Sequence, residues 1–397
     1  MVTRALRHRD AVSGRCEFGY DGSMKDAQDI LAYIRQRTEP FSRLSYCDAD
    51  ALVLSALSYY HFEDVPEIAE MRASVRVRDL LSYAPLETYA QRMFGDKNMG
   101  TLLEAIIESP RFGPLSLLHF SYYVSEELTT QFSATTFRIS EDGAADEELV
   151  LSFRGTDIEQ FAWNEDFNLC IMPEIPSELF AVTYFESVLQ VHPDARVHLT
   201  GHSKGGTLAE FACATADDEQ AGKIADVVTF DAPGLSCLGS RACPEFIERD
   251  SDMALLQHER GVLLKKYVFP SMLGLLMETR PVDRLLTVDT SGAGMGHDVF
   301  TPKIVDGIIQ TKAYPGWMLD NGLWVNRWVV RLSLDERRAV IDCLFDAFGP
   351  DANSFVFRGP QDMLSVLLSA VRGRVHLPRA QGRLVNRAAL KLRQALF

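Results

Sequence analysis

The spacing of apolar and polar positions divides the chain into three parts. Residues 1 to 27 are polar and glycine-spotted, and we expect them to be disordered. Residues 48 to 60 place apolar side chains on a wide helical face, which predicts a buried helix. Residues 77 to 127 are interpreted as a mostly helical insertion that forms a cap. After residue 300 the pattern again favours helices.

The centre of the chain alternates short apolar runs with helical segments. Strands are expected at 132–139, 148–153, 197–200, 224–230, 263–269 and 285–288, and helices at 29–37, 179–191 and 207–216. This alternation predicts a mostly parallel sheet with helices on both faces. We therefore expect an α/β domain over residues 28–330 and a helical extension over residues 331–397.

One motif in this domain carries chemistry. An apolar run ending at Thr200 meets Gly-His-Ser-Lys-Gly-Gly at 201–206, and a helix-forming stretch follows at once. Gly-x-Ser-x-Gly between a strand and a helix is typical of a nucleophile turn. Side chains at Gly201 and Gly205 would collide with the neighbouring strand or helix. The motif predicts that the Ser203 hydroxyl is a nucleophile at a helix N-terminus. The alternative is a tight strand-to-helix turn with no catalytic role.

A serine nucleophile needs a histidine to accept its proton. Three histidines follow Ser203 in the chain, at His258, His297 and His376. His258 has a helical context and His376 lies in a basic segment. His297 follows the last expected strand in a glycine-rich loop, where a base should emerge. We predict His297 as the base.

The histidine in turn needs an acid to orient it. Asp231 ends the strand after the nucleophile helix, so its side chain should reach the same edge of the sheet as Ser203. We favour Asp231 and keep Asp283 and Asp289 as alternatives.

An oxyanion hole needs two N–H donors, one from the residue after the nucleophile and one from a loop after an earlier strand. Lys204 fills the first position. The strand that ends near Phe153 leads into Arg-Gly-Thr, so we predict Thr156 as the second donor.

The motifs now resemble a known group. Phe-Arg-Gly-Thr at 153–156, Trp163 with Asp166, and Gly-His-Ser-x-Gly-Gly resemble fungal-type class 3 lipases. A closer resemblance is to an uncharacterised bacterial lipase-like α/β-hydrolase family. It is carried by Gly-His-Ser-Lys-Gly-Gly, Phe-Asp-x-Pro-Gly at 230–234, Trp-x-Glu-Asp-Phe at 163–167 and Gly-His-Asp at 296–298.

The resemblance implies an α/β-hydrolase fold and a serine hydrolase that cleaves carboxylic esters, above all lipid or fatty-acyl esters. Three departures from the class 3 pattern stand out. This chain has Lys204 where those lipases have leucine, Asp231 where they have glycine, and Pro270-Ser271 where they have the acid. A thioesterase, an acyltransferase, a peptidase or a non-catalytic binding module at a membrane surface are the competing interpretations.

The composition limits the classes of partner that we expect for this protein. The formal charge of −15 over 397 residues argues against nucleic acid as the main partner. Seven cysteines without a Cys-x-x-Cys pair, and a start that does not read as a signal peptide, predict a cytoplasmic protein. We expect no cofactor and no metal, because no second histidine or cysteine stands at ligand spacing from His202.

The last segment differs from the acidic remainder. From Met363 to Phe397 the chain has no acid. Its basic residues are Arg372, Arg374, Arg379, Arg383, Arg387, Lys391 and Arg393. One interpretation is a solvated helix face that lies on the acidic body. The other is peripheral contact with an anionic membrane.

Overall fold

The computed structural model describes most of the central part of the chain. The described residues are 28–70, 73–89, 96–141, 143–144, 146–156, 160–172, 174–235, 261–271, 273–278, 285–291, 296–313, 325–329, 331–348 and 379–396. The expected disorder of residues 1–27 lies outside them.

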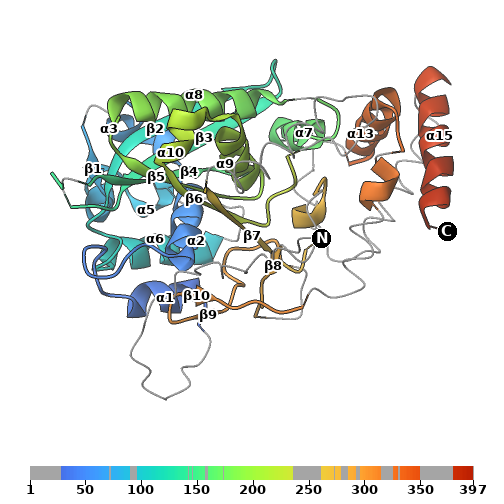
Figure 1. Ribbon diagram of the computed structural model, residues 1–397. Coiled ribbons are helices and arrows are strands. Elements are labelled where there is room, and N and C mark those ends of the chain that lie inside the picture. Colours follow the sequence, from blue (N-terminus) through green and yellow to red (C-terminus); the bar gives the residue numbers. More distant parts are fainter. Residues whose placement is uncertain are drawn as a thin grey trace, which may run out of the picture.

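A single eight-stranded sheet organises the molecule (Figure 1). Its strands follow one another in chain order. They are β1 (Val75–Arg76), β2 (Ser116–Ser125), β3 (Thr130–Arg138), β4 (Glu148–Phe153), β5 (Arg196–His202), β6 (Ile224–Phe230), β7 (Leu263–Val268) and β8 (Leu286–Thr287). The strands from β1 to β4 pair antiparallel, and those from β4 to β8 pair parallel.

Helices cover both faces of this sheet (Figure 1). One face carries α8 (Pro176–Val191) and α9 (Lys204–Thr215), and the other carries α1 (Ile30–Gln36), α2 (Asp48–Leu57) and α6 (Asp96–Glu108). Strand side chains alternate between the two layers, so Leu149 and Leu151 join the core under α8 while Val150 joins the core under α2. The predicted α/β fold is confirmed.

Shorter elements complete the described residues. They are α3 (Pro66–Ala69), α4 (Leu80–Tyr83), α5 (Leu86–Tyr89), α7 (Gln160–Asn168), α10 (Asp218–Lys223), the 3-10 turns η1 (Phe62–Asp64), η2 (Val77–Asp79) and η3 (Leu273–Leu275), and a hairpin of β9 (Ile304–Val305) and β10 (Ile308–Ile309). Besides these short elements, the described residues form two longer helices, α13 (Leu334–Phe348) and α15 (Arg379–Leu396).

Two sequence predictions are wrong in part. In the segment 77–127 the described residues up to Glu108 are mostly helical, but Ser116–Ser125 is strand β2. Phe120, Tyr122 and Val124 suit a pleated surface, and β2 pairs with β3 over its whole length. The helices of this segment pack in the core beneath the sheet, and a capping role stays a prediction. After residue 300 the chain first forms the β9–β10 hairpin before α13 begins.

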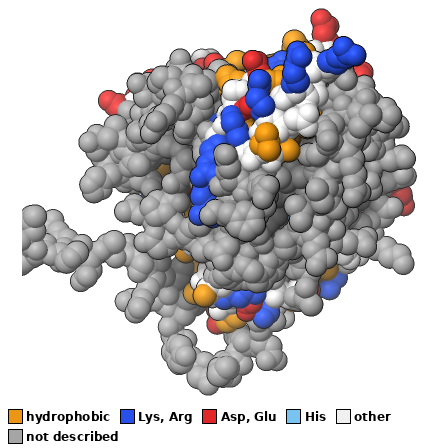
Figure 2. Space-filling view, turned by 90° about the vertical axis from the view of Figure 1, so that its right-hand side faces the viewer, with side chains coloured by type: hydrophobic (Ala, Val, Ile, Leu, Met, Phe, Trp, Pro, Cys, Tyr) orange, Lys and Arg blue, Asp and Glu red, His pale blue; other side chains and the backbone are white. Residues whose placement is uncertain are grey.

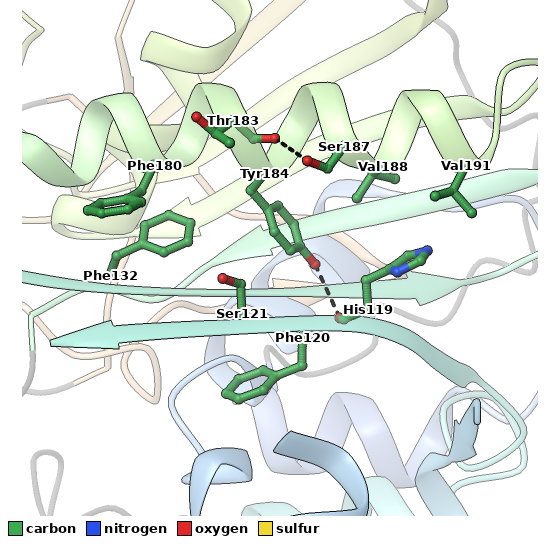
Figure 3. A pocket seen from close by; sticks show the side chains of 10 residues that line it. All are labelled: His119, Phe120, Ser121, Phe132, Phe180, Thr183, Tyr184, Ser187, Val188 and Val191. Carbon is green, nitrogen blue, oxygen red and sulfur yellow. Dashed lines mark hydrogen bonds between the residues drawn. The ribbon is translucent and has the colours of Figure 1, made fainter. Parts of the chain in front are cut away.

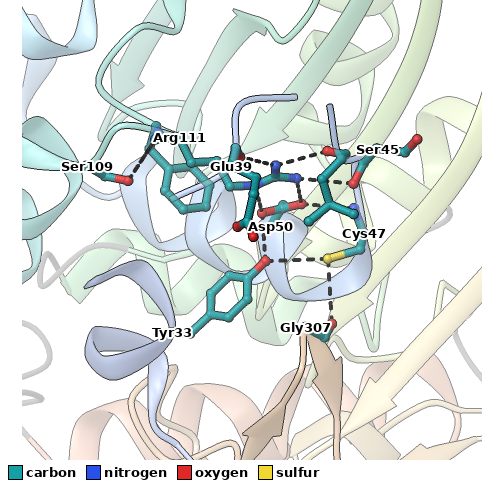
Figure 4. Close-up of polar contacts among 10 residues, drawn as sticks. Tyr33, Glu39, Ser45, Cys47, Asp50, Ser109, Arg111 and Gly307 are labelled. Atoms are coloured by element: carbon teal, nitrogen blue, oxygen red, sulfur yellow. Dashed lines mark hydrogen bonds and ion pairs between the residues drawn. The ribbon is translucent and has the colours of Figure 1, made fainter. Parts of the chain in front are cut away.

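A buried ion pair joins α2, and the loop before it, to the turn between α6 and β2 (Figure 4). Arg111 bonds both oxygens of Asp50, at 2.8 and 2.6 Å, and its remaining N–H groups bond the carbonyls of Glu39, Leu44 and Ser45. We call Arg111, Asp50 and the Tyr33 hydroxyl that bonds Asp50 the Arg111 cluster. Both charged side chains are fully buried, so this cluster belongs to the core.

Within the described residues, the helices are all too short or too polar to cross a membrane.

Candidate active site

The nucleophile turn lies where β5 passes into α9. Ser203 has a φ of +57°, which is rare for a residue with a side chain and is a strained conformation at a functional position. A side chain at Gly201 would meet the backbone of Gly205 at 2.3 Å, and one at Gly205 would meet the Phe153 carbonyl oxygen at 2.1 Å. The two glycines therefore permit the close packing that the motif predicts.

Asp231 and His297, far apart in sequence, meet at the same edge of the sheet. Nδ1 of His297 lies 2.6 Å from Oδ2 of Asp231. Asp231 is fully buried at the end of β6, where its Oδ1 accepts the Phe269 N–H at 3.0 Å and its Oδ2 accepts the Ser271 hydroxyl. Because a carboxylate only accepts, this contact assigns the His297 proton to Nδ1.

The other ring nitrogen of His297 is the atom that would act on a serine. Its Nε2 is buried and has no hydrogen-bond partner among the described residues. The His297 ring lies against that of His202, the residue before Ser203, with 4.4 Å between ring centroids. The unpaired lone pair of a held imidazole thus lies beside the nucleophile turn.

His202 is a site residue that sequence analysis did not assign. Its Nδ1 lies 2.9 Å from the Tyr59 hydroxyl, which comes from just after α2. Burial, together with the neighbouring His297, lowers the pKa of His202 well below its ordinary value. His202 is therefore an uncharged ring that packs against the ring of His297. The Leu-Ser-Tyr at 57–59, near the end of the predicted 48–60 helix, was the available sequence signal for Tyr59.

Lys204 turns its side chain into the protein. Its Nζ donates to Oε2 of Glu165 at 2.8 Å and to the carbonyl oxygen of Gln131 at 2.8 Å, and only 1% of its side chain is exposed. Burial alone would raise the pKa of Glu165, but Lys204 and neighbouring N–H groups hold it below its ordinary value. Lys204 is the first residue of α9, where helix N–H groups have no partner inside the helix.

Thr156 is linked to this lysine through Asp166. The loop after β4 buries Thr156 completely, and its hydroxyl donates to Oδ2 of Asp166 on α7. Asp166 Oδ1 lies 3.8 Å from Lys204 Nζ and is buried without a hydrogen bond. Burial raises the pKa of Asp166 to about 6, against the opposing effects of Lys204, Thr156 and His297. We call Lys204, Glu165, Asp166 and Thr156 the Lys204 cluster.

The alternatives to the predicted acid and base lie elsewhere. Asp289 pairs with Lys303 at 2.9 Å and with Lys312 at 3.0 Å. Asp283, His258 and His376 lie outside the described residues. The structure thus joins Asp231 to His297 directly, and it places Thr156 and Lys204 around Asp166.

A cavity of about 300 Å³ opens between α8 and the strands β2 and β3 (Figure 3). Apolar and aromatic side chains, among them Phe132, Phe180 and Tyr184, line most of it. None of the predicted site residues contributes to its wall, so this cavity is separate from the Ser203 site.

The mostly parallel sheet with helices on both faces (Figure 1), together with the strand–turn–helix at Ser203, defines an α/β-hydrolase fold. The chain belongs to the Mbeg1-like family, whose model matches residues 106–346.

Two solved structures of lipases are also similar to this chain. M37 lipase is 15% identical, over 72% of this chain and 78% of its own, with a TM-score of 0.35. Lipase II from Rhizopus niveus is 15% identical, over 68% of this chain and 90% of its own, with a TM-score of 0.31.

Proposed function

We propose that this protein is a serine hydrolase that cleaves carboxylic esters at Ser203. The observation that carries the proposal is the hydrogen bonding of the two ring nitrogens of His297. A fully buried carboxylate holds its Nδ1, while its buried Nε2 keeps an unused lone pair beside the nucleophile turn. That is the arrangement a general base needs.

The reaction follows from these positions. Ser203 Oγ attacks the acyl carbon as His297 Nε2 takes the hydroxyl proton. The same proton then passes to the leaving alcohol, and an acyl-serine forms. Water attacks the acyl-serine with His297 again as base, which releases the acid and restores Ser203. Asp231 keeps its charge and stabilises the imidazolium through the Nδ1 contact.

The oxyanion of each tetrahedral intermediate needs preorganised donors. Lys204 offers its backbone N–H at the start of α9, and Thr156 offers its backbone N–H from the loop after β4, where its hydroxyl donates to Asp166. The side chain of Lys204 supports both, because it binds Glu165 and faces the Asp166 that orients Thr156. In this arrangement Lys204 is a positioning residue, and its buried amine does not meet substrate.

A lysine next to the nucleophile could also attract an anionic headgroup of the substrate. The buried ion pair with Glu165 supports the alternative, an internal salt bridge. We propose a fatty-acyl ester as the substrate class, by the resemblance of the motifs to lipases.

The direct test is hydrolysis of p-nitrophenyl acyl esters of increasing chain length by the full chain. We expect turnover in the wild type and a loss of about 10⁴-fold or more in kcat for Ser203→Ala and His297→Ala. Asp231→Asn should fall by a similar factor, since the neutral amide no longer holds the Nδ1 proton.

Lys303→Met serves as a matched control. It removes a cation that pairs with Asp289, and these two residues flank the segment that carries His297. A folded wild type without turnover on any ester, including thioesters, would contradict the proposal and favour a non-catalytic binding module.

A further inference from the structure

Helix α15 carries more unbalanced positive charge than any other element that the structure describes. Its 18 residues, Arg379–Leu396, carry basic side chains and no carboxylate. Arg379, Arg383 and Arg387 recur every fourth residue, so they share one side of the helix. We call these three residues the arginine stripe. Residues 379–396 lie outside the part of the chain that the family model matches.

The opposite side of α15 is fixed against the protein. Val385 and Ala388 are buried. The indole N–H of Trp328 donates to the Ala388 carbonyl oxygen at 3.0 Å, and Gln381 bonds Asp342 of α13 at 3.3 Å. The apolar face is therefore already covered, and the helix presents its basic face to solvent in a fixed orientation.

Counter-charges on the protein cover only one end of this face. Glu336 of α13 pairs with Arg387 at 3.3 Å and with Lys391 at 2.5 Å. Arg387 keeps 61% of its side chain exposed despite this contact. No carboxylate of the described residues pairs with Arg379 or Arg383, so the first half of the stripe carries uncompensated positive charge.

An apolar side chain accompanies the charge. Leu390 follows Arg383 and Arg387 on the same side of the helix and is 65% exposed. The face seen in Figure 2 shows a row of Lys and Arg side chains with hydrophobic atoms beside it. Basic residues flanking an exposed leucine suit an anionic bilayer surface, where guanidinium groups meet phosphates and the leucine enters the interface. A nucleic acid backbone would leave Leu390 in water.

We propose that the arginine stripe, with Leu390, is a docking surface for anionic phospholipid membranes. The contact is peripheral and electrostatic, so it weakens as salt rises. It is independent of the chemistry at Ser203, because no residue of α15 takes part in the site.

The test is cosedimentation of the full chain with vesicles of phosphatidylcholine alone or with about 30 mol% phosphatidylserine. We expect binding to the anionic vesicles only, and release between about 50 and 500 mM NaCl. Arg379→Glu/Arg383→Glu should lower partitioning by about 30-fold or more, since each cation near the surface is worth about fivefold. Leu390→Ala should lower it by a few-fold.

Matched controls separate the stripe from net charge. Arg43→Glu/Arg196→Glu makes the same change of charge at two exposed arginines elsewhere, and Leu179→Ala removes another half-exposed leucine. Both should bind like the wild type, and Ser203→Ala should too. Equal binding by the stripe variant and the wild type would overturn the proposal. So would a lack of binding by the wild type, or stripe-dependent binding of duplex DNA without binding of vesicles.

Discussion

The Arg111 cluster and the Lys204 cluster are both buried, and both join a cation to carboxylates from distant parts of the chain. They differ in how completely they are satisfied. The guanidinium of Arg111 makes five hydrogen bonds, and each oxygen of Asp50 receives two donors. In the Lys204 cluster, Oδ1 of Asp166 is buried without a hydrogen bond.

This difference separates a structural from a functional use of buried charge. A network with every donor and acceptor filled has nothing left to offer a substrate, and it only holds segments together. A network that leaves an acceptor open beside a nucleophile retains polarity that reactants can use, at a cost in stability. We therefore expect damage to the Arg111 cluster to lower stability and damage to the Lys204 cluster to lower the rate.

The largest expected effect is on stability, in Arg111→Met. The substitution leaves Asp50 as an uncompensated buried charge, so the free energy of unfolding should fall by about 3–5 kcal/mol. Urea unfolding followed by fluorescence measures it. The double variant Arg111→Met/Asp50→Asn should regain part of the loss. A folded Arg111→Met enzyme should keep its kcat within about twofold. A tenfold drop would contradict the purely structural role of the Arg111 cluster.

Lys204→Met should affect both quantities. Glu165 keeps the Thr130 hydroxyl and the N–H groups of Gln131 and Ser177 as donors, so the loss of unfolding free energy should be about 3 kcal/mol, the lower end for a broken buried pair. The kcat should fall about tenfold, because α7 no longer holds Asp166 and Thr156 in place.

The double variant Lys204→Met/Glu165→Gln separates the two effects of that lysine. Removing the stranded carboxylate together with its cation should restore stability but not kcat. If kcat recovers along with the melting temperature, Lys204 only supports the fold.

One hydroxyl from each cluster gives a matched pair. Tyr33 donates to Asp50 at 2.8 Å, and Thr156 donates to Asp166. Thr156→Val should lower kcat by up to about 10²-fold, because the loop that presents the Thr156 N–H to the oxyanion loses its hydrogen bond to Asp166. Tyr33→Phe should cost about 1–2 kcal/mol of stability and leave kcat unchanged. Steady-state kinetics and urea midpoints on both variants decide the point, and equal kinetics would contradict the assignment of Thr156.

The smallest expected effect concerns pH. Burial raises the pKa of Asp166 to about 6 in the folded protein, so the folded state binds this proton more tightly than the unfolded state. Ionisation therefore costs stability, and the wild type should lose stability relative to Asp166→Asn as pH rises from about 4 to 7. The expected change is about 2 kcal/mol, because the pKa rises from 3.8 to about 6 and most of the resulting effect develops over this pH range; urea midpoints at both pH values measure it. A change of opposite sign would mean that Lys204 outweighs burial.

Local patterns predicted most of the core strands and the strand-end position of Asp231, because a parallel strand leaves a strong apolar run and its carboxyl end faces the site. They missed β2, whose ten residues read as helix until β3 is placed beside them. The orientation of the Lys204 side chain was equally hidden, since its partner Glu165 lies 39 residues away. Long-range pairing decides both cases, and a single sequence does not display it.

Labelling of the full chain with a fluorophosphonate, followed by mass spectrometry of the modified peptide, tests the central claim most directly. If Ser203 is activated by His297 and Asp231, the wild type should carry one covalent adduct on Ser203. The adduct should disappear in Ser203→Ala and His297→Ala and persist in Arg111→Met. A folded wild type that stays unlabelled, or an adduct that survives in His297→Ala, would contradict the account.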